Sequence, residues 1–276
     1  MNLVIQGPGF EARHAEQLAK LTGAREIEPL SPAACRLRGA ARHDELAAWC
    51  EEHQLDCAWV PAGRRFDELR LLAMDMDSTL ITIECIDEIG ALYGVRNKIS
   101  AITAATMRGE LDFTHSLRQR VALLEGLEES ALGRVYDEKL RLSPGAESLI
   151  ARCKAARVKT LLVSGGFTFF AERLKARLGL DFAHASVLEV RDGRLTGKLS
   201  GEIVNPAVKA RVLRETTAKL RATREQVVAI GDGANDLPMM TEAGVSIAFR
   251  AKPIVHENAT YALDYSGLEG VLNLFE

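Results

Sequence analysis

Two acidic residues, Asp75 and Asp77, follow directly on the apolar run Leu71–Met74, which is typical of a buried strand. Placed together at a strand end, one carboxylate can act as a nucleophile or metal ligand and the other as a proton donor. Burying either group without a partner is unfavourable, so this chemistry needs a nearby cation. The ordinary alternative is a solvated turn, in which Asp and Ser are favoured residues.

Two further apolar runs also end in small and polar residues. Residues 161–163 lead into Ser164-Gly165-Gly166-Phe167, and residues 227–230 lead into Gly231-Asp232-Gly233-Ala234-Asn235-Asp236. Between them, Lys209 lies near the start of a predicted helix over residues 206–220. Ligands of open α/β sheets bind at the strand ends, so these turns are expected to converge on one site.

Read in chain order, these motifs resemble those of the haloacid-dehalogenase superfamily of aspartyl-phosphate phosphotransferases. The longer strings at residues 75–89, 116–121, 164–167 and 231–236 are similar to those of its phosphoserine phosphatases. The resemblance extends over residues 70 to 276. It implies an Mg²⁺-dependent enzyme that hydrolyses phosphoserine in the last step of serine biosynthesis.

The resemblance also implies the chemical roles at the strand ends. Asp75 is expected to be the nucleophile that becomes an aspartyl-phosphate, and Asp77 the general acid and base. Mg²⁺ is expected to bind Asp75, the main-chain carbonyl of Asp77, and Asp232, with Asp236 orienting these ligands. The expected contacts to the phosphoryl group are Ser164, the Gly165 amide and Lys209, and Asn235 is expected to contact either the phosphate or the rest of the substrate.

Specificity is expected from the segment after the first motif. By resemblance, Glu84 faces the substrate ammonium and Arg120 its carboxylate, which together complement a zwitterion. Arg118 is the alternative arginine on the same predicted helix, and the Ser-Leu-Arg-x-Arg string favours Arg120. Met107 and Phe113 are expected to cover the substrate, although helical spacing also suits both to a core.

The coarse periodicity indicates how these residues are positioned. Helical patterns at residues 85–93, 98–107, 113–124 and 129–140 predict a cap inserted after the first strand, over residues 85–140. From residue 158 onward, strands alternate with helices. The fold class is therefore α/β, a Rossmann-like doubly wound parallel sheet in a phosphatase domain of residues 64–276.

Residues 1–63 are predicted to form a separate small α+β domain. Strands at residues 3–6, 35–38 and 57–60 alternate with helices at 11–21 and 44–53, before a break at Pro61-Ala62-Gly63. The pattern suits an ACT-like or ferredoxin-like module for regulation or for formation of a homodimer. A domain with its own core is expected to be removable at this break.

Composition excludes several functional classes. The 35 basic and 38 acidic residues give a net charge of −3, so no basic field indicates nucleic acid or an anionic membrane. Five cysteines without Cys-x-x-Cys spacing indicate reduced thiols. Neither a signal peptide nor a bilayer-spanning run is recognisable, which predicts a cytoplasmic protein with a small-molecule substrate.

Two other functions remain open on the sequence. The chain could be a phosphatase of the same superfamily acting on another small phosphate, such as phosphothreonine or a sugar phosphate. It could also be a serine-binding regulatory protein on an inactive phosphatase scaffold. The intact Asp75, Ser164 and Lys209 argue against the second alternative.

Overall fold

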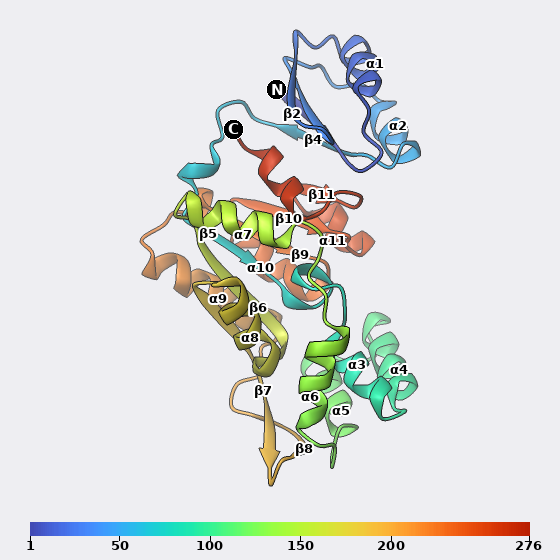
Figure 1. Ribbon diagram of the computed structural model, residues 1–276, viewed down its shortest axis with the longest axis vertical. Helices are drawn as coiled ribbons and strands as arrows, with labels where there is room; N and C mark the ends of the chain where they lie inside the picture. Colours follow the sequence, from blue (N-terminus) through green and yellow to red (C-terminus); the bar gives the residue numbers. More distant parts are fainter.

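The computed structural model describes residues 1–276, and its parts are stacked along the longest axis (Figure 1). A small domain containing the N-terminus lies at one end, a large sheet with helices lies in the middle, and a helical cap lies at the other end. None of the helices combines the length and the apolarity that crossing a bilayer requires.

The large sheet has seven strands in the order β11-β10-β9-β5-β6-β7-β8. Every neighbouring pair is parallel except β7 and β8, which form an antiparallel hairpin at one edge. This confirms the predicted α/β class and adds an antiparallel edge strand. The strands are β5 (Leu71–Met74), β6 (Lys159–Phe167), β7 (Phe182–Arg191), β8 (Arg194–Ser200), β9 (Val227–Gly231), β10 (Val245–Phe249) and β11 (Tyr261–Leu263).

Helices cover both faces of this sheet because the side chains of its central strand alternate between two cores. Leu72 and Met74 of β5 belong to one core, whereas Leu71 and Ala73 belong to the other. On the first face lie α7 (Ala146–Ala155) and α8 (Thr168–Leu178), and on the second lie α9 (Pro206–Lys219), α10 (Leu237–Thr241) and α11 (Pro253–Asn258). Helix α7 was not among the predicted elements.

The cap follows the first strand, as the sequence predicts. It contains α3 (Cys85–Leu92), α4 (Arg96–Met107), α5 (Phe113–Ala122) and α6 (Ser130–Arg134), which continues as a wider helical turn over Val135–Lys139. The two connections to the sheet domain pair with each other: the Thr82 N–H donates to the Arg141 carbonyl and the Ser143 N–H to the Leu80 carbonyl. The cap therefore enters and leaves the sheet domain through one narrow stalk.

The hairpin of β7 and β8 holds the cap at a second place. Backbone N–H groups of Gly126, Leu195 and Glu129 donate to the carbonyls of Leu195, Leu127 and Gly193 at 2.8, 2.8 and 2.9 Å. Gly197 has a φ of +73°, and a Cβ there would lie 2.9 Å from the Glu125 side chain. A glycine at this position therefore lets the hairpin lie against α5.

The N-terminal domain is a four-stranded antiparallel sheet in the order β2-β3-β1-β4. Its elements are β1 (Asn2–Gln6), α1 (Ala12–Thr22), β2 (Glu26–Ser31), β3 (Ala34–Arg38), α2 (Leu46–Glu52) and β4 (Asp56–Val60). Leu3, Ile5 and Leu37 pack with both helices in a core of their own. The domain confirms the predicted α+β class, and β2 is a strand that was not predicted.

The other face of this small sheet packs on the C-terminal segment, which lies between the two domains (Figure 1). The Asp56 carboxylate accepts N–H groups of Asp264, Tyr265 and Ser266 at 2.7, 3.2 and 2.8 Å. Val4, Ala58 and Val60 belong to the large core of the sheet domain. The shared core and the buried polar contacts argue against free removal of residues 1–63.

Candidate functional site

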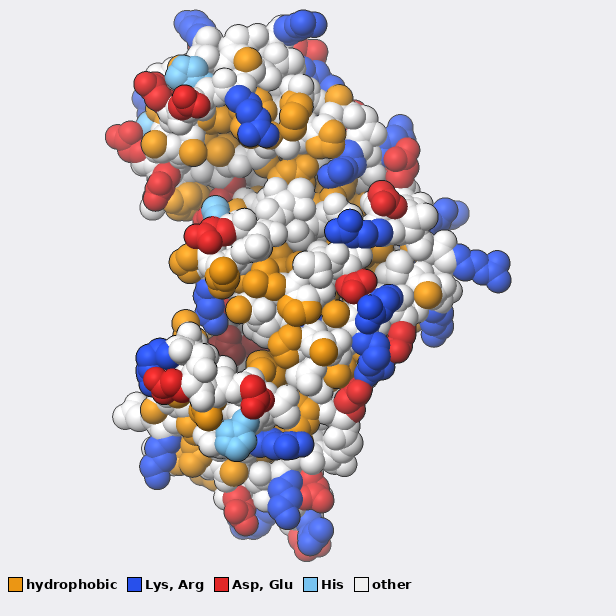
Figure 2. Space-filling view, turned by 180° about the vertical axis from the view of Figure 1, so that it is seen from behind, with side chains coloured by type: hydrophobic (Ala, Val, Ile, Leu, Met, Phe, Trp, Pro, Cys, Tyr) orange, Lys and Arg blue, Asp and Glu red, His pale blue; other side chains and the backbone are white.

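A cavity of about 850 Å³ lies between the ends of β5, β6 and β9 and the cap. Seen from behind, the surface is hollowed between its middle and its cap, with acidic side chains at the floor (Figure 2). The cavity brings together ten of the predicted site residues, namely Asp75, Asp77, Glu84, Met107, Phe113, Arg120, Ser164, Gly165, Asp232 and Asn235. Lys209 and Asp236, which were also expected at the site, do not line the cavity.

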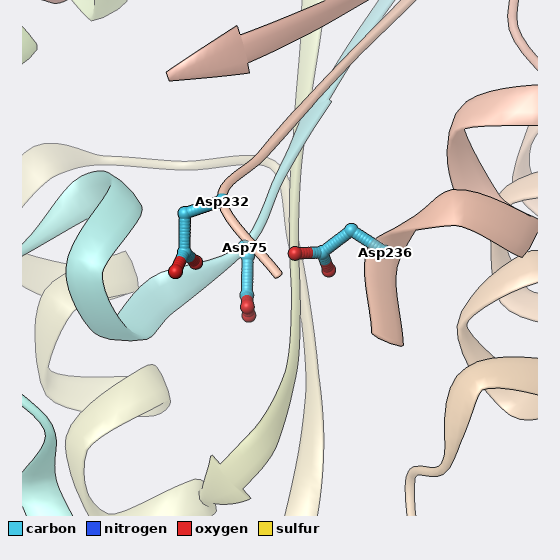
Figure 3. A group of neighbouring side chains, drawn as sticks. All are labelled: Asp75, Asp232 and Asp236. Atoms are coloured by element: carbon cyan, nitrogen blue, oxygen red, sulfur yellow. The ribbon is translucent and has the colours of Figure 1, made fainter. Parts of the chain in front are cut away.

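Three carboxylates converge at this end of the cavity, Asp75 and Asp232 in its lining and Asp236 buried beneath it. One oxygen of each of Asp75, Asp232 and Asp236 lies within 4.8 Å of the others, and Figure 3 shows the Asp75 side chain between those of Asp232 and Asp236, which both come from the turn after β9. Burial and the charge of Asp236 raise the pKa of Asp75 to about 7, against the attraction of Lys209. Burial and the neighbouring Asp75, Asp236 and Glu84 raise the pKa of Asp232 to about 8. The cluster thus carries more negative charge than its surroundings neutralise.

Lys209 lies directly behind the nucleophile candidate. Its Nζ contacts Asp75 Oδ1 at 2.8 Å and Asp236 Oδ1 at 2.7 Å, and the side chain is 0% exposed. Burial alone would lower its pKa, but the two carboxylates raise the pKa above its usual value. The lysine is held by the first turn of α9, where the Asn205 side chain accepts the Val208 N–H at 3.0 Å and Pro206 is the first helical residue.

Asp77 lies beside Asp75, where it is half-buried and lines the cavity. Its Oδ1 accepts the Cys85 N–H at 3.1 Å, and a Cβ at Gly166 would lie 2.6 Å from Oδ2. Ser78, which follows it, has a φ of +56° and turns the chain sharply at this point. Burial, together with the charge of Glu84, raises the pKa of Asp77 well above its ordinary value. A raised pKa favours the protonated form of this carboxyl group, which is the form that general acid catalysis needs.

The end of β6 supplies polar groups across from Asp75. The Ser164 hydroxyl accepts the Gly166 N–H at 2.9 Å, and its own proton is free to donate into the cavity. A Cβ at Gly165 would lie 2.6 Å from the Phe113 ring. Glycine at this position therefore lets an aromatic ring of the cap rest on the backbone of the sheet domain.

The cap contributes charge and an apolar edge. Glu84 accepts the Ser78 hydroxyl at 2.8 Å. Burial lowers the pKa of Arg120, whereas the charges of Glu84, Asp87 and Asp77 act to raise it. The Nε of Arg120 is a buried hydrogen-bond donor without a partner. Met107 lines the cavity although it is 65% exposed, whereas the alternative Arg118 is exposed outside the cavity.

The cavity also contains functional candidates that the sequence reasoning missed. Asp87 lines it three residues after Glu84, a spacing that places both acids on one side of α3. Lys252 lines it from the sheet domain, just before α11. The three-residue spacing between Glu84 and Asp87 could have identified Asp87 from the sequence. An isolated lysine next to a proline has no pattern that would identify Lys252.

The clustered carboxylates fit a divalent cation. Oxygen ligands and several open positions suit Mg²⁺. Asp236 has both oxygens engaged, since Oδ1 contacts Lys209 and Oδ2 accepts the Gly233 N–H at 3.1 Å. Asp75 and Asp232 are therefore the carboxylates with free acceptor capacity, and Asp236 fixes their surroundings.

Comparisons with known proteins agree with this geometry. The family model of haloacid dehalogenase-like hydrolases matches residues 72–241, and a domain of unknown function (DUF4072) matches residues 3–46. The phosphoserine phosphatase of Albidiferax ferrireducens is 49% identical over 217 residues, which are 77% of this chain and 92% of that protein. The phosphoserine phosphatase of Haemophilus influenzae is 44% identical over 80% of this chain and 70% of its own length.

Solved structures extend the similarity to the whole chain. A HAD family hydrolase of Salmonella enterica has a TM-score of 0.89 and 32% identity, covering 100% of this chain and 98% of its own. A probable phosphoserine phosphatase of Vibrio cholerae has a TM-score of 0.86 and 35% identity, covering 99% and 85%. A phosphoserine phosphatase with bound substrate has a TM-score of 0.71 and 37% identity, covering 75% and 99%.

Proposed function

The chain belongs to the haloacid dehalogenase-like hydrolases, and we propose that it is a phosphoserine phosphatase that hydrolyses O-phospho-L-serine to L-serine and phosphate. We further propose that it requires Mg²⁺ and that it completes serine biosynthesis in the cytoplasm. The five cysteines are all free, as expected in a reducing compartment. The observation that carries the proposal is the buried Asp75 at the cavity floor, with Asp77 beside it and Lys209 behind it.

Asp75 acts as the nucleophile in the first half of the reaction. Its carboxylate oxygen attacks the phosphorus, and the bond between phosphorus and the serine oxygen breaks. Lys209 keeps Asp75 ionised and oriented, because its ammonium contacts Oδ1 at 2.8 Å. Asp77 enters this step protonated and gives its proton to the departing serine oxygen.

Hydrolysis of the aspartyl-phosphate completes the cycle. Asp77, now ionised, takes a proton from a water molecule whose oxygen attacks the phosphorus, and the bond to Asp75 breaks. Asp77 thereby regains the proton that it gave in the first half-reaction. Donors from the Ser164 hydroxyl, the Gly165 amide and the Asn235 amide hold the phosphoryl oxygens.

Mg²⁺ would be held by Asp75, Asp232 and the Asp77 carbonyl, and when bound it supplies positive charge against the phosphate and the clustered carboxylates. Asp236 keeps Lys209 and the Gly233 backbone in place beside these ligands. The raised pKa values of Asp75 and Asp232 support this assignment, because a bound cation favours their ionised forms.

Substrate selection depends on the two walls of the cavity. Glu84 binds the substrate ammonium and Arg120 its carboxylate, while Met107 and Phe113 cover the apolar carbon atoms. The buried unpartnered Nε of Arg120 supports a role in binding an anion, since a carboxylate would satisfy donors of this guanidinium.

Phosphate release from L-phosphoserine, with Mg²⁺ and with excess chelator, tests the proposal. Turnover should occur only with Mg²⁺ and be poorly supported by Ca²⁺, which takes looser coordination. Phosphothreonine and a sugar phosphate serve as comparison substrates. A higher kcat/KM on either would replace phosphoserine as the substrate, and full activity in chelator would exclude the metal.

A further inference from the structure

Lys252 borders the cavity from the side of the sheet domain. Its side chain is exposed, and Asn235, Pro253 and Ile254 line the cavity near it. The Lys252 N–H donates to the Asp232 carbonyl at 3.0 Å. The backbone of Lys252 is thereby fixed to the turn that carries an expected metal ligand.

The cations of the site differ in what they are free to bind. Lys209 is fully buried between Asp75 and Asp236 and is absent from the cavity lining. Arg120 is on the cap, where Glu84 and Asp87 act on its charge. Lys252 has no ion pair or side-chain hydrogen bond, so its ammonium is available to a ligand.

The negative charge of the cavity means that an anionic substrate needs a cation such as this free ammonium. Five acids line the cavity against two cations, and a phosphate monoester that enters carries two negative charges on its phosphate near neutral pH. The acids are Asp75, Asp77, Glu84, Asp87 and Asp232. The charge of Lys252 already acts on this floor, because it opposes the burial that raises the pKa of Asp232.

We propose that Lys252 is a phosphate-binding residue, whose ammonium attracts the dianionic phosphate group of the substrate into the cavity and contacts its oxygens near Asp232. This inference rests on the proposed phosphatase function. It assigns Lys252 to the phosphate and Arg120 to the amino-acid part, so the two cations recognise opposite ends of the substrate. Inorganic phosphate, the product, carries the same group and is held by the same contact.

Substitutions of Lys252 in the full chain distinguish the contribution of its side chain from that of its backbone hydrogen bond. Lys252→Ala keeps the hydrogen bond from the backbone N–H of residue 252 to the Asp232 carbonyl. Lys252→Arg also keeps the positive charge of the side chain. Lys198→Ala is the control, because Lys198 is an exposed lysine on β8 outside the cavity. The measurements are kcat/KM on phosphoserine and on an aryl phosphate at several salt concentrations, and inhibition by inorganic phosphate.

We expect Lys252→Ala to lower kcat/KM about tenfold on both substrates and to weaken phosphate inhibition, as for the loss of one charge-assisted contact of about 1.4 kcal/mol. The decrease of kcat/KM with added salt should become shallower, because a charge that guides association is screened by salt. Lys252→Arg should retain most of the wild-type values. A purely structural role would leave the salt dependence unchanged.

Two results would overturn the inference. Equal kcat/KM and equal salt dependence for Lys252→Ala and Lys198→Ala would show that Lys252 is an ordinary surface lysine. A loss on phosphoserine alone would assign Lys252 to the amino-acid part. If the wild-type protein hydrolyses neither substrate, the proposed function fails. Calorimetric binding of inorganic phosphate with Mg²⁺ then decides the inference alone, and equal affinity of wild type and Lys252→Ala would reject it.

Discussion

Lys209→Met removes the one cation buried beneath the active site while keeping most of the side-chain volume. In the wild type, Nζ contacts Asp75 and Asp236 at 2.8 and 2.7 Å in a fully buried setting. The variant leaves two neighbouring carboxylates without this partner, and Asp232 lies close to both. We therefore expect a loss of stability together with a loss of turnover, because Asp75 would be protonated more readily.

The magnitude follows from the two contacts. Each hydrogen bond to a charged group contributes about 1.5–3 kcal/mol, and removing one partner of a buried ion pair costs about 3–5 kcal/mol in total. We expect the free energy of unfolding to fall by about 4 kcal/mol at pH 8. The deficit should shrink toward pH 5, because the raised pKa of Asp75 lets protonation remove one of the two unpaired charges.

Urea unfolding in the presence of chelator measures this change without a compensating metal ion. Lys219→Met on the same helix is the control, since Lys219 is exposed and should alter stability by less than about 1 kcal/mol. Added Mg²⁺ should restore part of the stability of the Lys209 variant. A loss no larger than in the control, unchanged between pH 8 and pH 5, would refute the role of Lys209 as the counter-charge.

Asp75→Asn should keep the fold but reduce phosphate release to background, because an amide cannot accept the phosphoryl group; a rate near the wild type would remove Asp75 as the nucleophile. Arg120→Ala should raise KM for phosphoserine by about 10–100-fold and change hydrolysis of an aryl phosphate little, whereas equal losses would assign Arg120 to the stability of the cap. Without metal, Asp75 and Asp232 hold protons that the unfolded chain releases at about pH 4, so the free energy of unfolding should fall as pH rises from about 4 to 8. Mg²⁺ should therefore stabilise the protein more at pH 8 than at pH 6, and a flat profile in urea titrations would contradict this. Asp56→Ala should lower stability by about 3 kcal/mol, and a chain that begins at Arg64 should aggregate or melt earlier, because the C-terminal segment loses its partners. A truncated protein that melts like the full chain would instead show an independent phosphatase domain.

Much of the candidate site could be predicted because it depends on strand ends. The carboxyl ends of β5, β6 and β9 lie at one edge of a parallel sheet, so Asp75, Ser164 and Asp232 converge whatever the details of the connections. The position of Lys209 relative to the phosphate could not be predicted in the same way. Its ion pairs with Asp75 and Asp236 depend on how α9 packs against two strands of the sheet. The spacing of residues along the sequence does not specify that packing.

The missed elements have different causes. Strand β2 contains Pro29 and is a mostly exposed edge strand, so it lacks the apolar alternation that identifies a half-buried strand. Helix α7, in contrast, buries Ala146, Leu149, Ile150 and Cys153, which recur at helical spacing. The spacing of these four residues is sufficient to predict the helix from the sequence.

The three backbone hydrogen bonds between the cap and the β7–β8 hairpin limit how substrate can be exchanged. A swing of the whole cap about its stalk would break the hydrogen bonds of Gly126, Leu195 and Glu129 with their partners, at about 0.5–1.5 kcal/mol each, or carry the hairpin along. The connection between α4 and α5, next to Met107 and Phe113, has no such bond to the hairpin. Exchange of substrate and phosphate is therefore expected to require a local displacement of this connection, which breaks none of these three hydrogen bonds, rather than a swing of the whole cap.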